Sequence, residues 1–533
     1  MKYLLPLVLG LAATLVGSCS AARSRTVLDV WAMGREGEVI GELVPEFERE
    51  NPGIAVRIQQ LPFTAAHEKL LTAFVGDAMP DMAQLGNSWV PEFAALGALE
   101  PLDRRVATTP AIPKADYYPG IWDSNLVDGT LYGVPWYVDT RLLFYRRDIL
   151  KQAGFDHPPR TWAEWRRQMV TIKKLVGPDK YAIYLPLNEY EPIEILGLQT
   201  PEPMVTDDAR ANFGNPGFRK ALDFYLGTMR DGLAPVTAST EVANVWDEFD
   251  RGWFSFYITG PWQIGEFKRR LPREHQNEWM TAPMPGPDGP GVSNAGGSSL
   301  VLFRSSAKKD AAWKLVEFLS RPGIQLRFHA LTGDMPPRIS VWQQPELARD
   351  PYAKAFGDQM TRLRATPKVP EWERIASDLK LVVEKAAHGQ LTTDQAAAEL
   401  DKRTDEILAK RRWILARKKH VGLLLRQPQL PKQTRPSLSP VRAELVEAQL
   451  SASRDESRPS TGSGRTDVRI TVGNTERLAG QRILRGYFIP TAPNTVRAEL
   501  VEARVPRDSP GSRPSTSSAR PAGMARANED ARS

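Results

Sequence analysis

The residues from Thr26 to Leu85 alternate between two hydrophobic periods, and this alternation limits the folds open to the chain. Three short stretches have the period of two that is typical of β-strands. The two stretches between them repeat apolar residues every three or four positions, as α-helices do. We expect strands at 27–33, 55–61 and 82–85, and helices around 39–47 and 67–74. This βαβαβ order predicts a parallel or mixed α/β sheet with helices on both faces.

Local signals mark where several helices start or stop. Thr161 and Thr392 each precede a Glu or Gln by three residues, which is the capping-box pattern of a helix N-terminus. The range 312–319 carries one apolar helix face that ends before Pro322. Pro45 falls inside the first expected helix, and we expect it to kink or shorten that helix because proline has no N–H to donate.

Cys19 is the only cysteine among the 533 residues, and it closes an N-terminal apolar run. One lysine, an apolar core at 4–16 and a small-residue ending predict a secretory signal at 1–18. The ending Leu15-Val16-Gly17-Ser18-Cys19 resembles a bacterial lipobox, whose cysteine is lipidated and becomes the new N-terminus. The alternatives are an ordinary signal peptide and a short transmembrane anchor, although the run is shorter than the ~20 residues that span a bilayer. A lipidated Cys19 leaves no thiol for disulfides, thiolate catalysis or Cys-based zinc sites.

The residues after 415 differ in composition from the rest. Positions 416–533 hold 21 Lys and Arg against 11 Asp and Glu, and they repeat one octapeptide exactly at 441–448 and 496–503. The net charge of +7 arises there, since the remaining residues sum to −3, and it gives no support to nucleic-acid binding by the folded part. So polar a segment buries too little apolar surface to fold, which predicts a disordered basic tail. A polybasic tail that binds the envelope is the alternative interpretation.

Sequence signatures of catalysis are missing. The chain has no Gly-x-Ser-x-Gly, no P-loop and no His-Glu-x-x-His, and its six histidines are widely scattered. We therefore expect neither a metal nor a cofactor. A carboxylate pair flanking a glycosidic bond could come from distant loops, and nothing in the sequence singles out such a pair.

Tryptophans instead recur where strands are expected to end, beside carboxylates, amides and glycines. These groups are Trp31 with Glu36, Asn87 with Trp89, the run from Trp136 to Arg141, and Gly260-Pro261-Trp262. Sugars require this mixture, because their C–H faces stack on aromatic rings and their hydroxyls bond to carboxylates, amides and guanidinium groups. Ligands of open α/β sheets lie beyond the carboxyl ends of the strands, so the pattern favours a sugar site. Any one tryptophan, taken alone, is more often a core residue.

The chain from Thr26 to Arg412 resembles the family 1 extracellular solute-binding proteins of ABC importers, particularly the sugar-binding branch. The motifs that carry the resemblance are Pro80-Asp81-Met82-Ala83-Gln84-Leu85, Trp89-Val90-Pro91-Glu92-Phe93, Leu131-Tyr132-Gly133-Val134-Pro135, the run from Asp139 to Tyr145, Pro159-Arg160-Thr161-Trp162, Gly260-Pro261-Trp262 and Gly296-Gly297. The resemblance implies a two-lobed periplasmic-binding-protein fold of type II, with lobes joined by crossing strands and the ligand between them. We expect a tether at 19–25, a first lobe of 26–136 and 262–320, and a second lobe of 137–261 and 321–415.

The resemblance also implies which residues hold the ligand. Glu36 and Asn87 would line the cleft from the first lobe, Asp139 would accept bonds from hydroxyls, and Trp262 would be the main stacking platform. Asn87 stands where relatives often have Thr, Ser or Asp, which leaves the exact sugar open. The other ligand-binding residues implied are Trp89, Tyr137, Arg141, Gly296, Gly297 and Arg338. The loop at 189–194 is expected to add contacts from the second lobe.

We therefore expect a receptor that captures a mono- or oligosaccharide, closes its lobes and delivers the ligand to the membrane permease of an ABC importer. It would act as a monomer, without enzymatic activity or a nucleic-acid partner. Cys19 would anchor it to a membrane in the cell envelope, in the periplasm or another extracytoplasmic space. The alternatives are a binding protein for a polyamine, peptide or phosphate ester, and a secreted carbohydrate-active enzyme.

Overall fold

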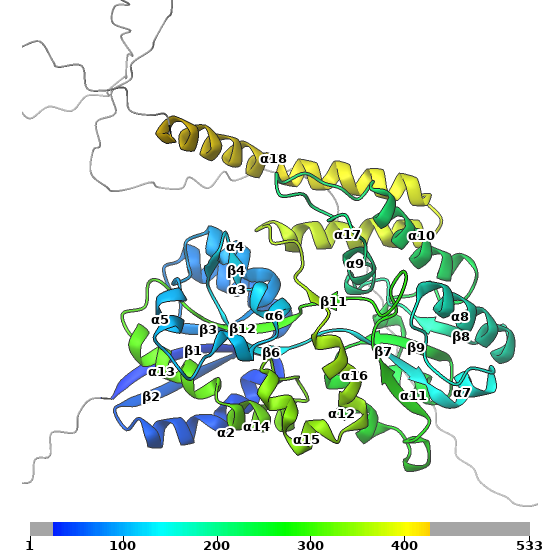
Figure 1. Ribbon diagram of the computed structural model, residues 1–533, viewed down its shortest axis with the longest axis horizontal. Coiled ribbons are helices and arrows are strands. Elements are labelled where there is room, and N and C mark those ends of the chain that lie inside the picture. Colours follow the sequence, from blue (N-terminus) through cyan, green and yellow to red (C-terminus); the bar gives the residue numbers. More distant parts are fainter. Residues whose placement is uncertain (1–24, 427–533) are drawn as a thin grey trace, which may run out of the picture. The chain divides into compact units, whose positions relative to one another are not determined.

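Two separate β-sheets organise the computed structural model, which describes residues 25–426 (Figure 1). The first sheet has five strands in the order β2-β1-β3-β12-β6, and the second has four in the order β10-β7-β9-β8. The first comprises β1 (Thr26–Met33), β2 (Ile54–Leu61), β3 (Met82–Gly86), β6 (Val134–Val138) and β12 (Gly297–Leu302). The second comprises β7 (Leu142–Arg146), β8 (Tyr181–Tyr184), β9 (Phe254–Thr259) and β10 (Trp279–Ala282). Two short pairs are β4 (Leu126–Val127) with β5 (Thr130–Leu131) and β11 (Ser293–Asn294) with β13 (Leu363–Arg364).

Helices cover both faces of each sheet. In chain order they are α2 (Gly34–Glu50), α3 (Phe63–Val75), α4 (Val90–Ala95), α5 (Asp103–Ala107), α6 (Pro119–Asp123), α7 (Arg147–Gln152), α8 (Trp162–Val176), α9 (Glu191–Leu198), α10 (Pro216–Arg230), α11 (Val245–Asp250), α12 (Trp262–Arg270), α13 (Lys309–Leu319), α14 (Pro322–Thr332), α15 (Pro345–Ala348), α16 (Pro351–Met360), α17 (Trp372–Ala387) and α18 (Thr393–Arg426). Helices α2 and α13 pack on one face of the first sheet and α3 and α4 on the other. This arrangement confirms the α/β, two-lobed prediction.

The first sheet follows directly from the hydrophobic periods of the sequence. Alternate residues of β1 are buried, with Leu28 and Val30 at most 1% exposed, because successive side chains of a strand point to opposite faces. β1 pairs in parallel with β2 and β3, and β12 joins β3 and β6 in antiparallel fashion. The three expected strands are therefore confirmed, and the carboxyl ends of β1, β2 and β3 meet at one edge of the sheet.

The chain crosses between the sheets at points that differ from the expected lobe boundaries. The range 262–320 was assigned to the first lobe, but its strand β10 pairs with β7 of the second sheet, with Ala282 opposite Leu143. The range 321–415 was assigned to the second lobe, but α14 packs on α2 beside the first sheet. Antiparallel pairing of β10 keeps α12 with the second sheet, so the chain crosses after Ala282 and not before Trp262.

The capping signals are confirmed, and the shortening expected at Pro45 does not occur. Thr161 accepts a bond from the Glu164 backbone N–H at 3.1 Å, and Thr392 and Gln395 form a reciprocal box at 2.9 and 3.2 Å. Helix α2 runs from Gly34 to Glu50 through Pro45 without being shortened. Its face packs on the sheet through residues such as Phe47, and this tertiary packing outweighs the lost hydrogen bond of the proline.

Helix α18 lies beside α17 and extends past the expected start of the disordered tail (Figure 1). It includes residues 416–426, so the boundary expected at Ala416 is wrong for these positions. The reason is that this stretch contains no proline before Pro428 and is rich in Arg, Lys and Leu, which are good helix formers. The expected signal at 1–18, the tether up to residue 24 and the rest of the tail lie outside the described residues. No helix within residues 25–426 has the length and apolarity needed to cross a membrane.

Candidate ligand-binding cleft

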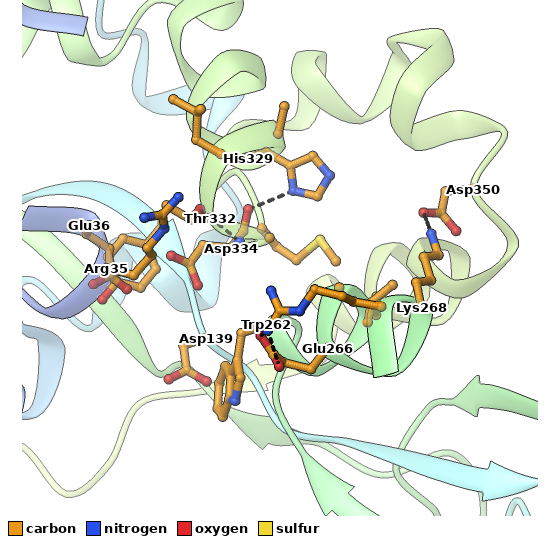
Figure 2. Close-up of a pocket in the computed structure, with 18 of the residues that line it drawn as sticks. Arg35, Glu36, Asp139, Trp262, Glu266, Lys268, His329, Thr332, Asp334 and Asp350 are labelled. Atoms are coloured by element: carbon orange, nitrogen blue, oxygen red, sulfur yellow. Dashed lines mark hydrogen bonds and ion pairs between the residues drawn. The ribbon is translucent and has the colours of Figure 1, made fainter. Parts of the chain in front are cut away.

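A cavity of about 1000 Å³ receives residues from elements of both lobes (Figure 2). Glu36 enters it from the first turn of α2, and Tyr137 and Asp139 enter from the end of β6 and the crossing segment that follows. Trp262, the first residue of α12, faces them from the second lobe, and Asp334 comes from the segment after α14. Five of the predicted ligand-binding residues are thus together in one cavity, since Arg141 also lines it.

Gly260 allows Trp262 to take its place in the wall. A Cβ built on Gly260 would fall inside the indole ring, so any other residue there would displace the ring. The motif Gly260-Pro261-Trp262 therefore has a steric reason: the glycine makes room, and the tryptophan starts a helix directly after strand β9. Trp262 remains half-buried, with part of its ring available to the cavity.

Three carboxyl groups gather on one side of the cavity. Burial raises the pKa of Glu36 above its ordinary value, and the nearby Asp139 carboxylate adds to this effect. Burial, followed by the charges of Glu36 and Asp139, holds the pKa of Asp334 well above its usual range. Crowded carboxylates resist ionising together, so Asp334 keeps a proton that a carboxylate would lose in water. This side of the cavity therefore offers both an acid donor and carboxylate acceptors.

The hydroxyl of Tyr137 is fixed beneath these acids. Gln84 Nε2 donates to Tyr137 Oη at 3.0 Å, and Ser298 Oγ lies 3.0 Å from the same oxygen. All three residues are buried in the first sheet, on the neighbouring strands β3, β12 and β6. The floor of the cavity is therefore a rigid polar layer and not a mobile loop.

Arg141 connects the carboxylates to the aromatic wall. Its Nη1 donates to Asp139 Oδ1 at 3.1 Å, its Nη2 donates to Glu191 Oε1 at 2.9 Å, and its guanidinium carbon lies 4.6 Å from the Trp262 ring centroid. Burial raises the pKa of Asp139 more than the Arg141 charge lowers it. Arg141 thus orients the carboxylate and supports the ring through a cation–π contact.

The cations that line the cavity all have acidic partners. Arg35 pairs with Glu38 at 2.8 Å, Lys268 with Asp350 at 2.8 Å and Arg269 with Glu266 at 2.5 Å, and Arg141 pairs as described above. Within residues 25–426, Glu36 and Asp334 form no ion pair with a cation. With the lining cations paired and Asp334 protonated, Glu36 is the acid left without a cationic partner among the described residues, and this acidic balance suits neutral polyols or cations better than anions.

Five predicted ligand-binding residues do not line this cavity. Asn87 donates to the carbonyls of Ala295 and Gly296 at 3.1 and 3.2 Å, which ties β3 to the crossing segment. Trp89 is 7% exposed and packs against His67 with ring centroids 4.9 Å apart. Cβ atoms on Gly296 and Gly297 would collide with the carbonyls of Asp139 and Tyr137, so both glycines permit close backbone packing.

Arg338 is the fifth, and its side chain is occupied by internal contacts. Its Nε donates to Asp116 Oδ2 at 2.6 Å, and its Nη1 donates to the carbonyls of Ala111 and Ser320 at 3.0 and 2.7 Å. The residue is 7% exposed. A buried guanidinium with these partners holds the fold together, and the predicted contact of Arg338 with ligand has no support in this geometry.

Asp334 and His329 line the cavity without having been predicted. Asp334 stands in the motif Gly333-Asp334-Met335, which the sequence interpretation used only to align Arg338. The signal for Asp334 was its position directly after a helix ending in Gly333, whose φ of 84° turns the chain sharply. His329 Nδ1 bonds to the Asp334 carbonyl at 2.8 Å, and burial lowers the pKa of its imidazole. No sequence pattern marked it.

No group of three or more His, Cys, Asp or Glu side chains within residues 25–426 is arranged to hold a metal ion. The side chains that line the cavity include the aromatic rings of Phe63, Tyr137 and Trp262, several carboxyl groups and the oriented guanidinium of Arg141. This set can bind and orient a polar ligand.

Two α/β lobes with an aromatic, acidic cavity at their junction define a class of proteins that capture small solutes. The chain belongs to the family of bacterial extracellular solute-binding proteins, whose family model matches residues 33–326. It is similar to the sugar-binding protein MalE of the phytopathogen Xanthomonas citri, with 55% identity, coverage of 73% of this chain and 99% of that one, and a TM-score of 0.72.

Two further relatives extend the comparison. A solute-binding protein of Thermotoga lettingae, solved with α-D-tagatose, is 26% identical and covers 72% of this chain and 100% of its own, with a TM-score of 0.62. The maltotriose-binding protein of Pyrococcus abyssi is 24% identical over 391 residues, which are 70% of this chain and 79% of that one. The family and these relatives are binding proteins, and membership of an extracellular family indicates an extracytoplasmic location.

Proposed function

We propose that the chain is the substrate-binding receptor of an ABC importer and that it captures a mono- or oligosaccharide in the cleft between its lobes. The observation that carries the proposal is the position of the Trp262 ring opposite Glu36, Asp139 and Asp334 in one cavity. A sugar ring presents a C–H face to an aromatic ring while its hydroxyls reach acidic groups at the edge. The relatives that bind α-D-tagatose and maltotriose support the same substrate class.

The proposed mechanism is capture by lobe closure and involves no bond breaking. Asp139 and the proton-bearing Asp334 would bond the hydroxyls of the ligand, and Trp262 would cover its apolar face. Ligand binding then shifts the equilibrium toward the closed form, and a membrane permease on another chain would recognise that form. We assign no catalytic residue, and we propose that the receptor acts as a monomer.

The proposal includes a lipid anchor at Cys19 in the cell envelope, where the receptor would stay close to its permease. A tether of this kind raises the effective concentration of the two partners without a new contact between them. The sequence motif at residues 15–19 supports this part of the proposal.

A panel of ligands tested by isothermal titration calorimetry distinguishes the solute classes. Maltose, maltotriose, tagatose, spermidine, a tripeptide and glucose 1-phosphate represent the competing chemistries. We expect binding by a saccharide and none by the phosphate ester, since every cation lining the cavity is already paired. The acidic balance makes spermidine the strongest rival, and binding of spermidine alone would replace the sugar proposal. Release of shorter saccharides during incubation would show an enzyme.

Trp262→Ala tests the stacking role against a matched control. We expect affinity to fall at least about tenfold, because stacking and apolar contact with one aromatic ring exceed about 1.4 kcal/mol together. Trp413 also has an arginine guanidinium 4.6 Å from its ring centroid, but it lies on α18 and is 58% exposed. Trp413→Ala should leave affinity unchanged. Equal affinities of the two variants would show that Trp262 is not the platform.

A further inference from the structure

Trp31 does not join the cleft, although the sequence places it beside Glu36. The structure separates the two residues: Glu36 lines the main cavity, whereas Trp31 lines a second hollow of about 630 Å³. We call this hollow the Trp31 groove; its walls are β1, β2 and the turn Ala78–Pro80 before β3. The proposed function leaves the groove without a role.

The alternation of β1 and β2 builds the groove. Leu28, Val30 and Ala32 face α2 and α13, so Asp29 and Trp31 lie on the opposite face of the sheet, where Trp31 is half-buried and packs against the core that α3 and α4 cover. The parallel register sets Asp29 beside Arg57 and Trp31 beside Gln59. An aromatic ring, an amide and an ion pair are thus fixed next to one another by two paired strands, which is a more precise placement than loops provide.

The Asp29–Arg57 ion pair lines the groove, and Lys69 lies over the Trp31 ring. Arg57 Nε donates to Asp29 Oδ1 at 2.5 Å, and Lys69 Nζ of α3 lies 5.2 Å from the Trp31 ring centroid. Gln60, by contrast, is used internally, since its Nε2 donates to the Gly34 carbonyl at 3.0 Å.

Two polar groups in the groove remain without partners. Within the described residues, the side-chain amide of Gln59 and the indole N–H of Trp31 form no hydrogen bond, and Gln59 is exposed. Donors and acceptors that flank the exposed part of an aromatic ring match a ligand with an apolar face and hydroxyl edges.

We propose that the Trp31 groove is a second carbohydrate-binding site, at the β1–β2 edge of the first sheet and apart from the cleft. A sugar would contact the Trp31 ring, and its hydroxyls would bond to Gln59 and to the Asp29–Arg57 pair. The groove lies on one lobe and has no second wall to close over a ligand, so we expect binding in the millimolar range. The groove is independent of lobe closure and would bind its ligand whether or not the cleft is occupied.

Fluorine NMR of the full chain labelled with fluorotryptophan reads the two sites separately. The Trp31 resonance is identified by its loss in Trp31→Phe, and those of Trp262 and Trp413 by their loss in the corresponding variants. In the unmutated chain, once the Trp262 resonance shows that the cleft is saturated, we expect raising maltotriose or cellobiose to about 20 mM to shift the Trp31 resonance further and to leave that of Trp413 in place.

Gln59→Ala supplies the variant that does not threaten the fold, since the side chain is exposed on the edge strand β2. We expect it to weaken the Trp31 titration by about threefold, the effect of one lost hydrogen bond. The inference is overturned if no saccharide moves the Trp31 resonance, or if the titration is the same with and without Gln59. Neither result concerns the cleft, because the Trp262 resonance of the unmutated chain reports cleft binding on its own.

Discussion

Replacing Arg338 by leucine separates a structural role from a ligand-binding one. The substitution removes the donors to Asp116 and to the carbonyls of Ala111 and Ser320. Bonds to a charged group contribute about 1.5–3 kcal/mol each, and breaking a buried ion pair on one side costs about 3–5 kcal/mol. Asp116 keeps its two bonds from Ser340, at 2.8 and 2.6 Å, which places the expected loss near the lower end, about 3 kcal/mol.

Urea unfolding followed by tryptophan fluorescence measures this loss, and calorimetry measures ligand affinity in the same preparation. The free energy of unfolding of Arg338→Lys should lie between those of the parent and of Arg338→Leu, because an ammonium reaches fewer of the three acceptors than a guanidinium does. Asp116→Asn completes a double-mutant cycle that isolates the pair. The structural role would be refuted by a variant whose free energy of unfolding lies within about 0.5 kcal/mol of the parent's but which no longer binds the ligand. That result would support the ligand contact predicted from the sequence.

Three further substitutions test other features of the chain. Gly297→Ala should lower the free energy of unfolding, measured in urea titrations, by more than about 2 kcal/mol. The reasons are that the φ of Gly297 is +108° and that an added Cβ would meet the Tyr137 carbonyl. Gly289→Ala is the control and should have little effect, because the space around Gly289 is open. The raised pKa of Asp334 means that the folded chain holds a proton that the unfolded chain loses above about pH 4, so stability falls as pH rises, by up to about 1.4 kcal/mol per pH unit for this group. In Asp334→Asn, the free energy of unfolding should fall less steeply with pH when it is measured at several pH values. An unchanged slope would show that Asp334 does not hold this proton. Cys19→Ala should move the protein of membrane fractions from the detergent phase to the aqueous phase, and unaltered partitioning would rule out the lipid anchor.

The fold was largely predictable because its signals are local. The period-two stretches and the capping threonines Thr161 and Thr392 depend on near neighbours, and the structure confirms them. Pro45 does not shorten α2 because its cost is offset by packing of the helix on a sheet whose strands come from elsewhere in the chain. Residues 262–282 were assigned to the wrong lobe for a similar reason, since only the pairing of β10 with β7 decides to which lobe they belong.

The site was predictable in part. Residues next to a strand end or crossing segment, such as Glu36 and Asp139, line the cavity because backbone position nearly decides where they lie. Asn87 and Arg338 have side chains that turn toward internal partners, and motif position does not tell the direction of a long or amide side chain. The place of Asp334 in the cavity could not be predicted from the sequence. Its role depends on the approach of Glu36, which comes from a strand–helix junction about 300 residues away.

The segment between β6 and β7 contains Asp139 and Arg141 and is also one of the links between the two sheets. Its backbone is held to the neighbouring link by the Asp139 N–H, which donates to the Gly296 carbonyl at 3.2 Å. In the proposed closure, the residues that contact the ligand would therefore lie in the hinge segment between the lobes. Ligand binding would act on the hinge directly, without an intermediate element. Ligand affinity and the angle between the lobes would then be coupled, so that a substitution at Asp139 changes both of them.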